Sequence, residues 1–228
     1  VIALAVLAGC GGPSGPPPRC RNVVQNPGWE NRAAGWNVPP FAKLEEAAVG
    51  GLRSMVIEGH ADGAIAQMVP KSQDLAGLGV IAVGYARVET TQLLEPTDDD
   101  VTARLWEGTV ALANGYFRRW GGNESPHAVV RFTGREAASG AWKRFVAPPI
   151  AVDRARTLYP HFAFWGVRLA PGMKLRVAAL SLVVSPEPGV EESEAWGACP
   201  ALAAPQPVLV SVTRRQFDED WEPNGSFD

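Results

Sequence analysis

Aromatic and charged residues alternate with small ones along two segments of this chain, which is its clearest sign of binding chemistry. Tyr85, Arg87 and Glu89 form one row, and Arg104 and Trp106 form another. Successive residues of a strand point to opposite faces, so we expect each row to face outward, on neighbouring strands. A sugar ring has a C–H face ringed by hydroxyl groups and suits an aromatic platform beside polar side chains. The rows predict a carbohydrate-binding face, although burial of Trp106 under a loop is an equal alternative.

Segment 114–127 contains glycines and a proline, so we expect a loop, yet it also carries aromatic and arginine side chains. We expect Tyr116 and Trp120 to close over the predicted face, with Trp120 exposed. The same loop could instead anchor a protein partner, since Tyr, Trp and Arg dominate such interfaces. A concave groove floored by Trp106 would favour a sugar, whereas a convex tip exposing Phe117 and Trp120 would favour a protein.

The sequence contains none of the common catalytic motifs. There is no Gly-x-Ser-x-Gly, no Gly-x-x-x-x-Gly-Lys and no Cys-x-x-Cys. His60, His127 and His161 lie far apart and do not have the spacing of metal ligands. Acidic residues are plentiful and two of them could meet as a glycosidase pair, but nothing marks a particular pair. We therefore expect no enzyme activity, no metal centre and no cofactor.

Composition limits the partners. The formal net charge is −3, and neither a basic stripe nor an RNA-binding motif is present, so nucleic acid is disfavoured as a partner. With 46% hydrophobic residues among 228, the chain can bury a sizeable core. Its 20 prolines and 24 glycines fall between apolar runs, where turns belong.

The elements that must position these residues are expected to be strands, with no convincing helix. The predicted strands are 54–59, 64–69, 79–94, 101–108, 128–133, 142–146, 161–169 and 174–184, after a first strand near residue 22. Turns are expected at 26–28, 60–63 and 95–100. The residues that we place inward are Val80, Ala82, Gly84, Ala86, Val88, Val101, Ala103 and Leu105. Trp165 alternates with His161, Ala163 and Val167, so we expect it to be packed.

The N-terminal residues predict export. Residues 1–9 form an apolar run that is too short to span a bilayer but fits a secretory signal. Residues 7–10, Leu-Ala-Gly-Cys, resemble the lipobox of bacterial lipoproteins, which implies that Cys10 is lipidated and anchors the protein to a membrane. The Gly/Pro-rich segment 11–19 that follows is typical of a tether. In an exported protein the two remaining cysteines, Cys20 and Cys199, most simply form a disulfide.

The order of several segments resembles the galactose-binding-like jelly-roll domains, a group that includes many carbohydrate-binding modules. The segments are NPGWE…GW at 26–36, SMVIEG, AIAQMV, GVIAVGYAR, WKRFVAPP and KLRVAALSL. The resemblance spans residues 22–184 and implies an all-β, two-sheet antiparallel jelly-roll sandwich. By their place in that pattern, Trp36 and Trp142 belong to the core, whereas Trp29 has no assignment.

Such modules often hold a structural calcium between a Glu near the opening motif and an Asp in the closing strand. Glu30 is present, but the closing strand has Val177-Ala178-Ala179-Leu180 with no acid. Calcium is therefore not expected there. The acidic run 98–100 could bind calcium weakly, although a solvated turn explains it better.

These expectations combine into a non-catalytic carbohydrate-binding domain on an exported, membrane-anchored bacterial lipoprotein, in the periplasm or on the cell surface. We divide the chain into a signal end at 1–10, a tether at 11–19, a sandwich at 20–200 and a linker with an acidic tail at 201–228. The alternative is a structural or adaptor lipoprotein whose sandwich binds a protein or a cell-wall component. A third possibility is an accessory module of a larger enzyme.

Overall fold

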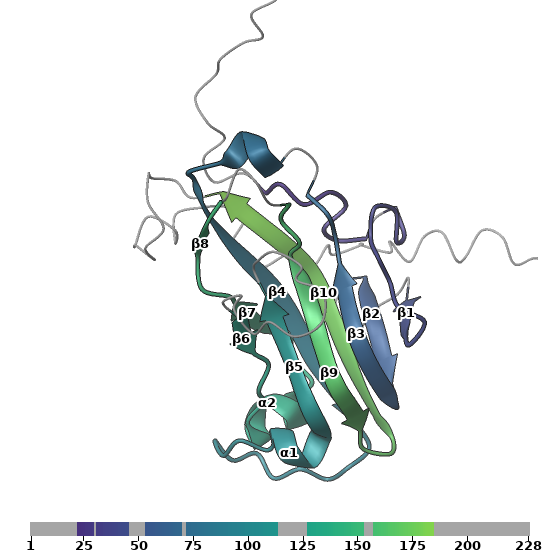
Figure 1. Cartoon of the computed structure of the whole chain (residues 1–228). Coiled ribbons are helices and arrows are strands. Elements are labelled where there is room, and N and C mark those ends of the chain that lie inside the picture. The colour runs from purple at the N-terminus through teal and green to yellow at the C-terminus, as the bar shows by residue number, and fades with distance from the viewer. Residues whose placement is uncertain are drawn as a thin grey trace, which may run out of the picture.

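The computed structural model describes residues 22–29, 31–45, 53–69, 72–113, 127–152 and 157–184. These residues form two antiparallel sheets that face each other, with short helices at the ends of the sandwich (Figure 1). The predicted all-β, two-sheet antiparallel fold is therefore confirmed. No helix in this part of the chain is long and apolar enough to cross a membrane.

The chain passes repeatedly between the two sheets. In sheet A the order is β1 (Ala42–Glu45), β2 (Ser54–Glu58), β10 (Met173–Val184), β4 (Gly79–Thr90) and β7 (Lys143–Val146), and β8 (Ile150–Ala151) also pairs with β4. In sheet B the order is β3 (His60–Ala66), β9 (His161–Leu169), β5 (Trp106–Ala113) and β6 (His127–Val129). Pairing of β2 with β10 and of β3 with β9 joins early strands to late ones, which is the arrangement of a jelly roll.

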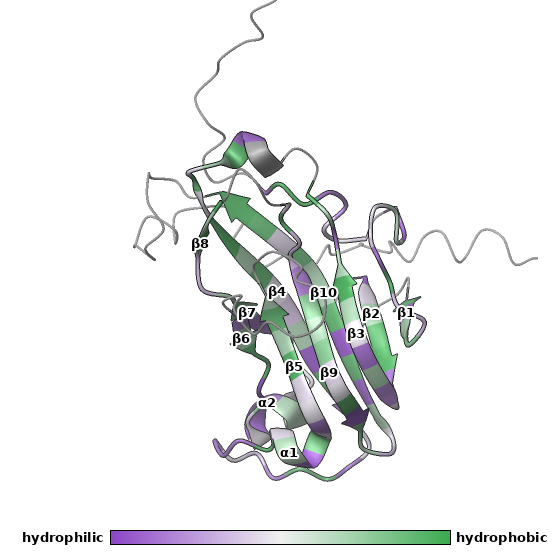
Figure 2. Ribbon diagram, in the orientation of Figure 1, coloured by the Kyte–Doolittle hydropathy of each residue, from purple (hydrophilic) through white to green (hydrophobic). Residues whose placement is uncertain are grey.

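The core lies between the sheets and is densest around β4. Every residue from Gly79 to Val88 is buried, and Figure 2 shows the upper parts of β4 and β10 as mostly apolar. A Cβ added to Gly84 would lie 2.5 Å from Cζ of Phe162 on sheet B. The row that contains Gly84 therefore faces the other sheet, as predicted, and the sheets approach closely where this side chain is absent.

The predicted strand 101–108 is wrong, because its first residues are helical. Residues Thr102–Leu105 form α1, and β5 begins only at Trp106. The Asp100 carboxylate accepts a hydrogen bond from the backbone N–H of Thr102 at 2.8 Å, which favours a helical turn here. This turn sends the chain from sheet A to sheet B, so β4 and β5 belong to different sheets and are not the neighbours that we expected.

A second short helix, α2 (Gly134–Ser139), was also not expected. It begins with a capping box, in which the Thr133 side chain accepts from the Glu136 N–H and the Glu136 carboxylate accepts from the Thr133 N–H. It ends at Gly140, whose φ of 60° is left-handed. The Thr-x-x-Glu pattern and this glycine are the sequence signals that could have revealed it.

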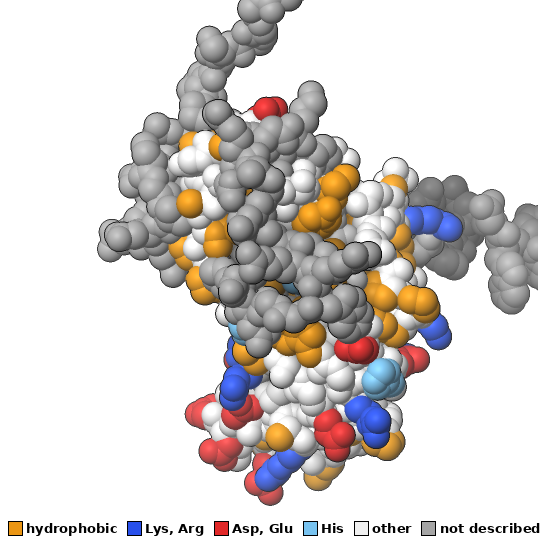
Figure 3. Space-filling view, viewed as in Figure 1, with side chains coloured by type: hydrophobic (Ala, Val, Ile, Leu, Met, Phe, Trp, Pro, Cys, Tyr) orange, Lys and Arg blue, Asp and Glu red, His pale blue; other side chains and the backbone are white. Residues whose placement is uncertain are grey.

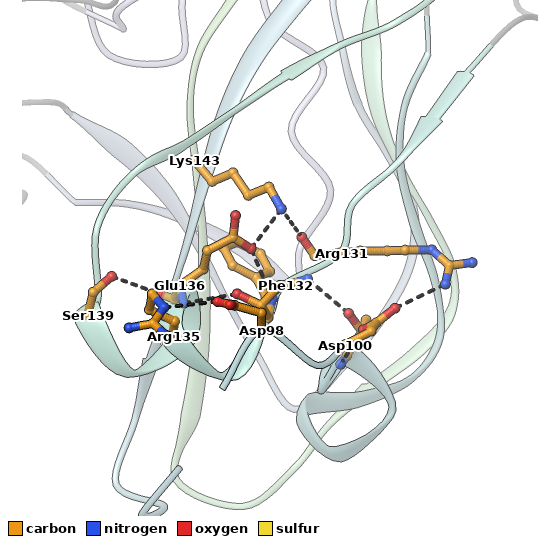
Figure 4. A network of polar contacts seen from close by, with 10 residues as sticks. Asp98, Asp100, Arg131, Phe132, Arg135, Glu136, Ser139 and Lys143 are labelled. Carbon is orange, nitrogen blue, oxygen red and sulfur yellow. Dashed lines mark hydrogen bonds and ion pairs between the residues drawn. The ribbon is translucent and has the colours of Figure 1, made fainter. Parts of the chain in front are cut away.

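Ion pairs attach α2 and the residues just before it to the acidic segment before α1 (Figure 4). Asp98 pairs with Arg135 at 2.9 Å, and Asp100 pairs with Arg131 at 3.0 Å. Asp98 and Asp100 therefore make structural contacts within the fold.

The predicted turn at 60–63 is wrong as well, since β3 begins at His60 and the chain reverses at Gly59, which has a φ of 68°.

Candidate binding site

The predicted row on β4 lies on the outer side of sheet A, within a network of charged side chains. The Arg87 guanidinium pairs with Glu89 and lies 5.2 Å from the centroid of the Trp142 ring. On β10, directly opposite Arg87, Arg176 contacts Glu89 at 2.8 Å and Glu45 at 2.5 Å. Two glutamates therefore accompany the two arginines.

This network is mostly buried. The side chains of Arg87 and Arg176 are only 7% and 8% exposed, and Tyr85 is also buried, which raises the pKa of its phenol. Like charges directly opposite each other on adjacent strands are destabilising, so Glu89 between the arginines stabilises the pairing of β4 with β10. Burial acts to raise the pKa of Glu89, but hydrogen bonds from Arg176 and Arg87 outweigh it and leave the pKa below its usual value.

The second predicted row does not join the first. Trp106 is 3% exposed and packs edge-to-face on Phe132, with 6.2 Å between ring centroids. Of the two alternatives for Trp106, the structure therefore supports burial and not an outward, exposed indole. Arg104 is exposed on α1, in the turn before β5. Tyr116 and Trp120 lie outside the described residues, as do Glu30, Cys10, Cys20 and Cys199.

We expected Trp36 and Trp142 in the core, and the structure places the first there and the second only partly buried. Trp36 is 8% exposed and belongs to the core. Trp142 is half-buried, and its ring lies beneath the Arg87 guanidinium on the outer side of sheet A. Trp29, which had no assignment from the sequence pattern, is fully buried.

The prediction that Trp165 is packed is wrong. Its side chain is 43% exposed, although we expected it to be packed. On β9, Phe162 and Phe164 point into the core and are fully buried, which leaves His161, Ala163 and Trp165 on the outer face of sheet B. A bulge beside Gly166, which has a φ of 56°, then returns Val167 to the core. The bulky Phe pair and this glycine could have indicated the correct face.

Polar side chains surround Trp165 on this outer face. The His127 ring, from β6, meets the indole edge-to-face with 5.7 Å between centroids, and Thr109 of β5 lies directly opposite it. Two residues further along the sheet, Glu107 and Arg168 lie opposite each other and both are exposed. Figure 3 shows acidic, basic and histidine side chains gathered around the lower ends of β3, β5 and β9.

The middle of the same face consists of small residues. Ala64, Ala163 and Ala111 lie side by side on β3, β9 and β5, and His161 lies between Ala66 and Ala113. Burial lowers the pKa of His161, despite the hydrogen-bonding contact of 2.7 Å between its Nδ1 and the Tyr159 carbonyl. The imidazole is therefore neutral at pH 7.

We call the exposed group around Trp165 the Trp165 face, defined by Trp165, His127, Thr109, Glu107 and Arg168. It combines an accessible indole with groups that donate and accept hydrogen bonds. Within the described residues, no group of three His, Cys, Asp or Glu side chains is arranged to hold a metal ion.

No family model matches this sequence, and no curated protein matches it. Among solved structures it is similar to a xylan-binding domain of carbohydrate-binding-module family 22, with 10% identity, a TM-score of 0.41 and coverage of 70% of this chain and 92% of that one. It is also similar to the family 22 and xylanase modules of Clostridium thermocellum xylanase 10B, complexed with xylohexaose, with 13% identity and a TM-score of 0.44. The match covers 72% of this chain and 28% of that one. A family 29 module from Piromyces equi is similar with 15% identity and a TM-score of 0.35, over 67% of this chain and 81% of that one. These neighbours are carbohydrate-binding β-sandwiches, and at such low identities and TM-scores they do not define a ligand for this chain.

Proposed function

We propose that this protein binds carbohydrate without transforming it, and that the Trp165 face is the binding surface. The observation that carries the proposal is the exposure of Trp165, 43%, beside the polar side chains of His127, Thr109, Glu107 and Arg168. An indole buries a large area when a ligand covers it, and its π face suits the C–H face of a sugar ring. An exposed indole amid polar side chains is thus a ready platform.

The neighbours of Trp165 supply what a sugar needs beside the platform. Hydroxyl groups require both donors and acceptors, and Arg168 donates, Glu107 accepts, and Thr109 does both. The His127 ring packs on the indole in a T-shaped contact, with 5.7 Å between centroids. The row at Tyr85, Arg87 and Glu89 offers less, because its arginine and glutamate already bind each other and little of it is exposed.

A protein partner is the second candidate function. Val129 of β6 is 37% exposed and lies on the same face as His127, next to the Trp165 face. Exposed apolar residues that cluster with a tryptophan favour a protein interface over a sugar site. In that case Val129 and Trp165 would act together as an anchor.

The test is a binding screen of the whole chain against soluble glycans and insoluble polysaccharides, including xylan. Trp165→Ala should weaken carbohydrate binding about tenfold or more, which corresponds to ~1.4 kcal/mol. Leu93→Ala is the matched control, because Leu93 is a fully exposed apolar residue outside this face. It should leave binding unchanged.

The outcomes separate the two candidates. Sugar binding that survives Val129→Ser but not Trp165→Ala supports the carbohydrate proposal. Absence of binding to every glycan and polysaccharide would refute it. Release of reducing ends from a bound polysaccharide would refute the non-catalytic part.

We also propose that the domain is displayed on the cell envelope through a lipid on Cys10. Support comes from the sequence alone, from the apolar run at 1–9 and the Leu-Ala-Gly-Cys that ends it. Labelling of expressing bacteria with an alkyne fatty acid should mark the protein, and Cys10→Ser should abolish the label. Labelling that persists in Cys10→Ser would contradict the proposal.

A further inference from the structure

A pocket lies away from the Trp165 face, where the opening segment runs beside the upper end of β3 (Figure 1). Its volume is about 590 Å³, which is within the usual range for small-molecule sites. The described residues that line it are Gly35, Trp36, Asn37, Ala66, Met68 and Tyr159.

The wall formed by Trp36 is held rigidly. The indole N–H of Trp36 donates to the Asn26 carbonyl at 3.0 Å, and the buried ring of Trp29 meets it edge-to-face with 5.7 Å between centroids. Next to it, the backbone of Asn37 exchanges two hydrogen bonds with Ala66 of β3, at 2.8 and 3.1 Å. The opening segment is thereby fixed against sheet B.

Asn26 closes the loop that carries this wall. Its side-chain amide donates to the carbonyl oxygens of Arg32 and Ala34 at 2.9 and 3.3 Å, and its oxygen accepts from the Asn31 N–H at 2.9 Å. The residue before Asn26, Gln25, is held by the buried side chain of Gln67, which accepts a hydrogen bond from the Gln25 N–H and donates one to the Gln25 carbonyl. The wall that carries Trp36 and Asn37 is therefore formed before a ligand arrives, which lowers the entropic cost of binding.

The lining chemistry favours one class of ligand. None of the described lining residues carries a charge, so these residues offer no ion pair and favour an uncharged ligand. Trp36 and Tyr159 offer aromatic rings, and Met68, 56% exposed, offers a flexible thioether that contacts aromatic rings favourably. A sugar would leave several hydroxyl groups desolvated without partners here, which is costly, whereas an aromatic ring would not.

Asn37 supplies a polar contact at the rim. Its side chain is exposed, and no hydrogen bond joins that amide to another described side chain or backbone group. An amide both donates and accepts, so it can bind a single hydroxyl group on a ligand. One polar group beside aromatic and thioether walls matches a phenol.

We propose that this pocket binds an uncharged aromatic ring that carries a hydroxyl group, with the ring against Met68, Trp36 and Tyr159 and the hydroxyl on Asn37. The proposal is independent of sugar binding at the Trp165 face. Such a group exists both in free phenolic compounds and in tyrosine side chains of partner proteins.

Methionine methyl groups provide a direct readout. The chain has three methionines, of which Met55 and Met173 are buried and only Met68 lies at the pocket. With ¹³C-methyl-methionine in the whole chain, p-cresol should shift the Met68 signal saturably through its ring current and leave the Met55 and Met173 signals in place. Met68→Leu identifies the signal by removing it.

Variants then test the chemistry. Asn37→Ala should weaken p-cresol binding about threefold to tenfold but leave toluene binding unchanged, because toluene has no hydroxyl group. Gln92→Ala, an exposed amide on the segment after β4, is the matched control and should change neither. Trp165→Ala should also leave p-cresol binding unchanged, so failure of the sugar proposal is distinguishable from failure of this one.

A second ligand shows whether the aromatic ring belongs to a free phenolic compound or to a tyrosine side chain. Binding of both p-cresol and N-acetyl-tyrosinamide would support a tyrosine side chain of a partner, whereas binding of p-cresol alone would support a free phenolic compound. Absence of a saturable shift, equal shifts of all three methyl signals, or a Met68 shift with xylose but not with p-cresol would overturn the proposal.

Discussion

His161 shows how a single side chain sets a property of the whole protein. Its imidazole lies on the outer face of sheet B between two alanines, yet it is buried and its pKa is lowered below the ordinary 6.5. In the unfolded chain the same group titrates near its ordinary pKa of about 6.5. Between the two pKa values the unfolded chain binds more protons than the folded one, so protons favour unfolding.

We therefore predict that the free energy of unfolding falls as the pH drops below about 6.5. Chemical denaturation at pH 7.5, 6.5 and 5.5 measures this, with His161→Gln as the variant that should flatten the dependence. Glu89 and Glu136 have lowered pKa values and so lose their contribution only below their ordinary 4.5, outside this interval. Parallel pH profiles of the wild type and His161→Gln would contradict the prediction.

The residue scale also shows the limit of sequence reasoning about the site. Alternation correctly grouped Tyr85 with Arg87 and Glu89, because strand geometry fixes which residues share a face. It could not say that Glu89 would bind Arg176, since that partner lies far away in the sequence. For Trp165, alternation correctly grouped it with His161 and Ala163 but not with Val167, which the bulge at Gly166 turns into the core. The predicted face was also wrong, because the direction of a side chain depends on which side of the strand the other sheet covers.

At the scale of elements, long strands were predictable and short helices were not. Strand β9 has the predicted bounds, His161–Leu169, and β10 begins one residue before the predicted 174. Many apolar residues specify each of these strands. In α1 and α2 a few side chains at the ends decide the conformation, so a pattern of apolar residues carries little information about them.

The capping box of α2 provides the prediction at this scale. Thr133→Ala should lower the free energy of unfolding by about 1 kcal/mol, because the N–H of Glu136 loses its acceptor. Thr133→Ser keeps the hydroxyl group and should retain most of the stability. Urea denaturation of both variants measures the difference, and an equal loss in both would show that the methyl group matters rather than the cap.

At the scale of the molecule, the two outer faces of the sandwich have different roles. On the outer side of sheet A, the buried Arg176 and the partly exposed Glu45 and Glu89 join β1, β4 and β10 by ion pairs. The outer side of sheet B carries the exposed Trp165. We expect the sheet A network to stabilise the fold, and the proposed function places ligand binding on sheet B.

Removing Glu89 tests this division. Glu89→Gln should lower the free energy of unfolding by about 1–3 kcal/mol, because two buried arginines then face each other without the shared carboxylate. Water reaches Glu89, 31% exposed, so the loss should stay below that of a fully buried pair. Carbohydrate binding by the folded variant should be unchanged.

Glu58→Gln is the matched control in sheet A. Glu58 pairs with Lys174 at 2.7 Å, but both side chains are more than 40% exposed. Exposed pairs contribute little, so this variant should change stability far less than Glu89→Gln. Equal losses in the two variants, or lost sugar binding in folded Glu89→Gln, would contradict the division between the faces.

The pairing of early strands with late ones has a consequence for how the protein acquires its structure. Asn22 bridges to Val183, and β2 pairs with β10 across more than a hundred residues. Contacts between such distant parts of a chain slow folding, because a long loop must close before they form. During synthesis the early strands β2 and β3 must therefore wait, with unpaired edges, until β9 and β10 leave the ribosome. The growing chain is most open to aggregation in that interval, and a nascent chain halted before residue 173 should remain a client of chaperones.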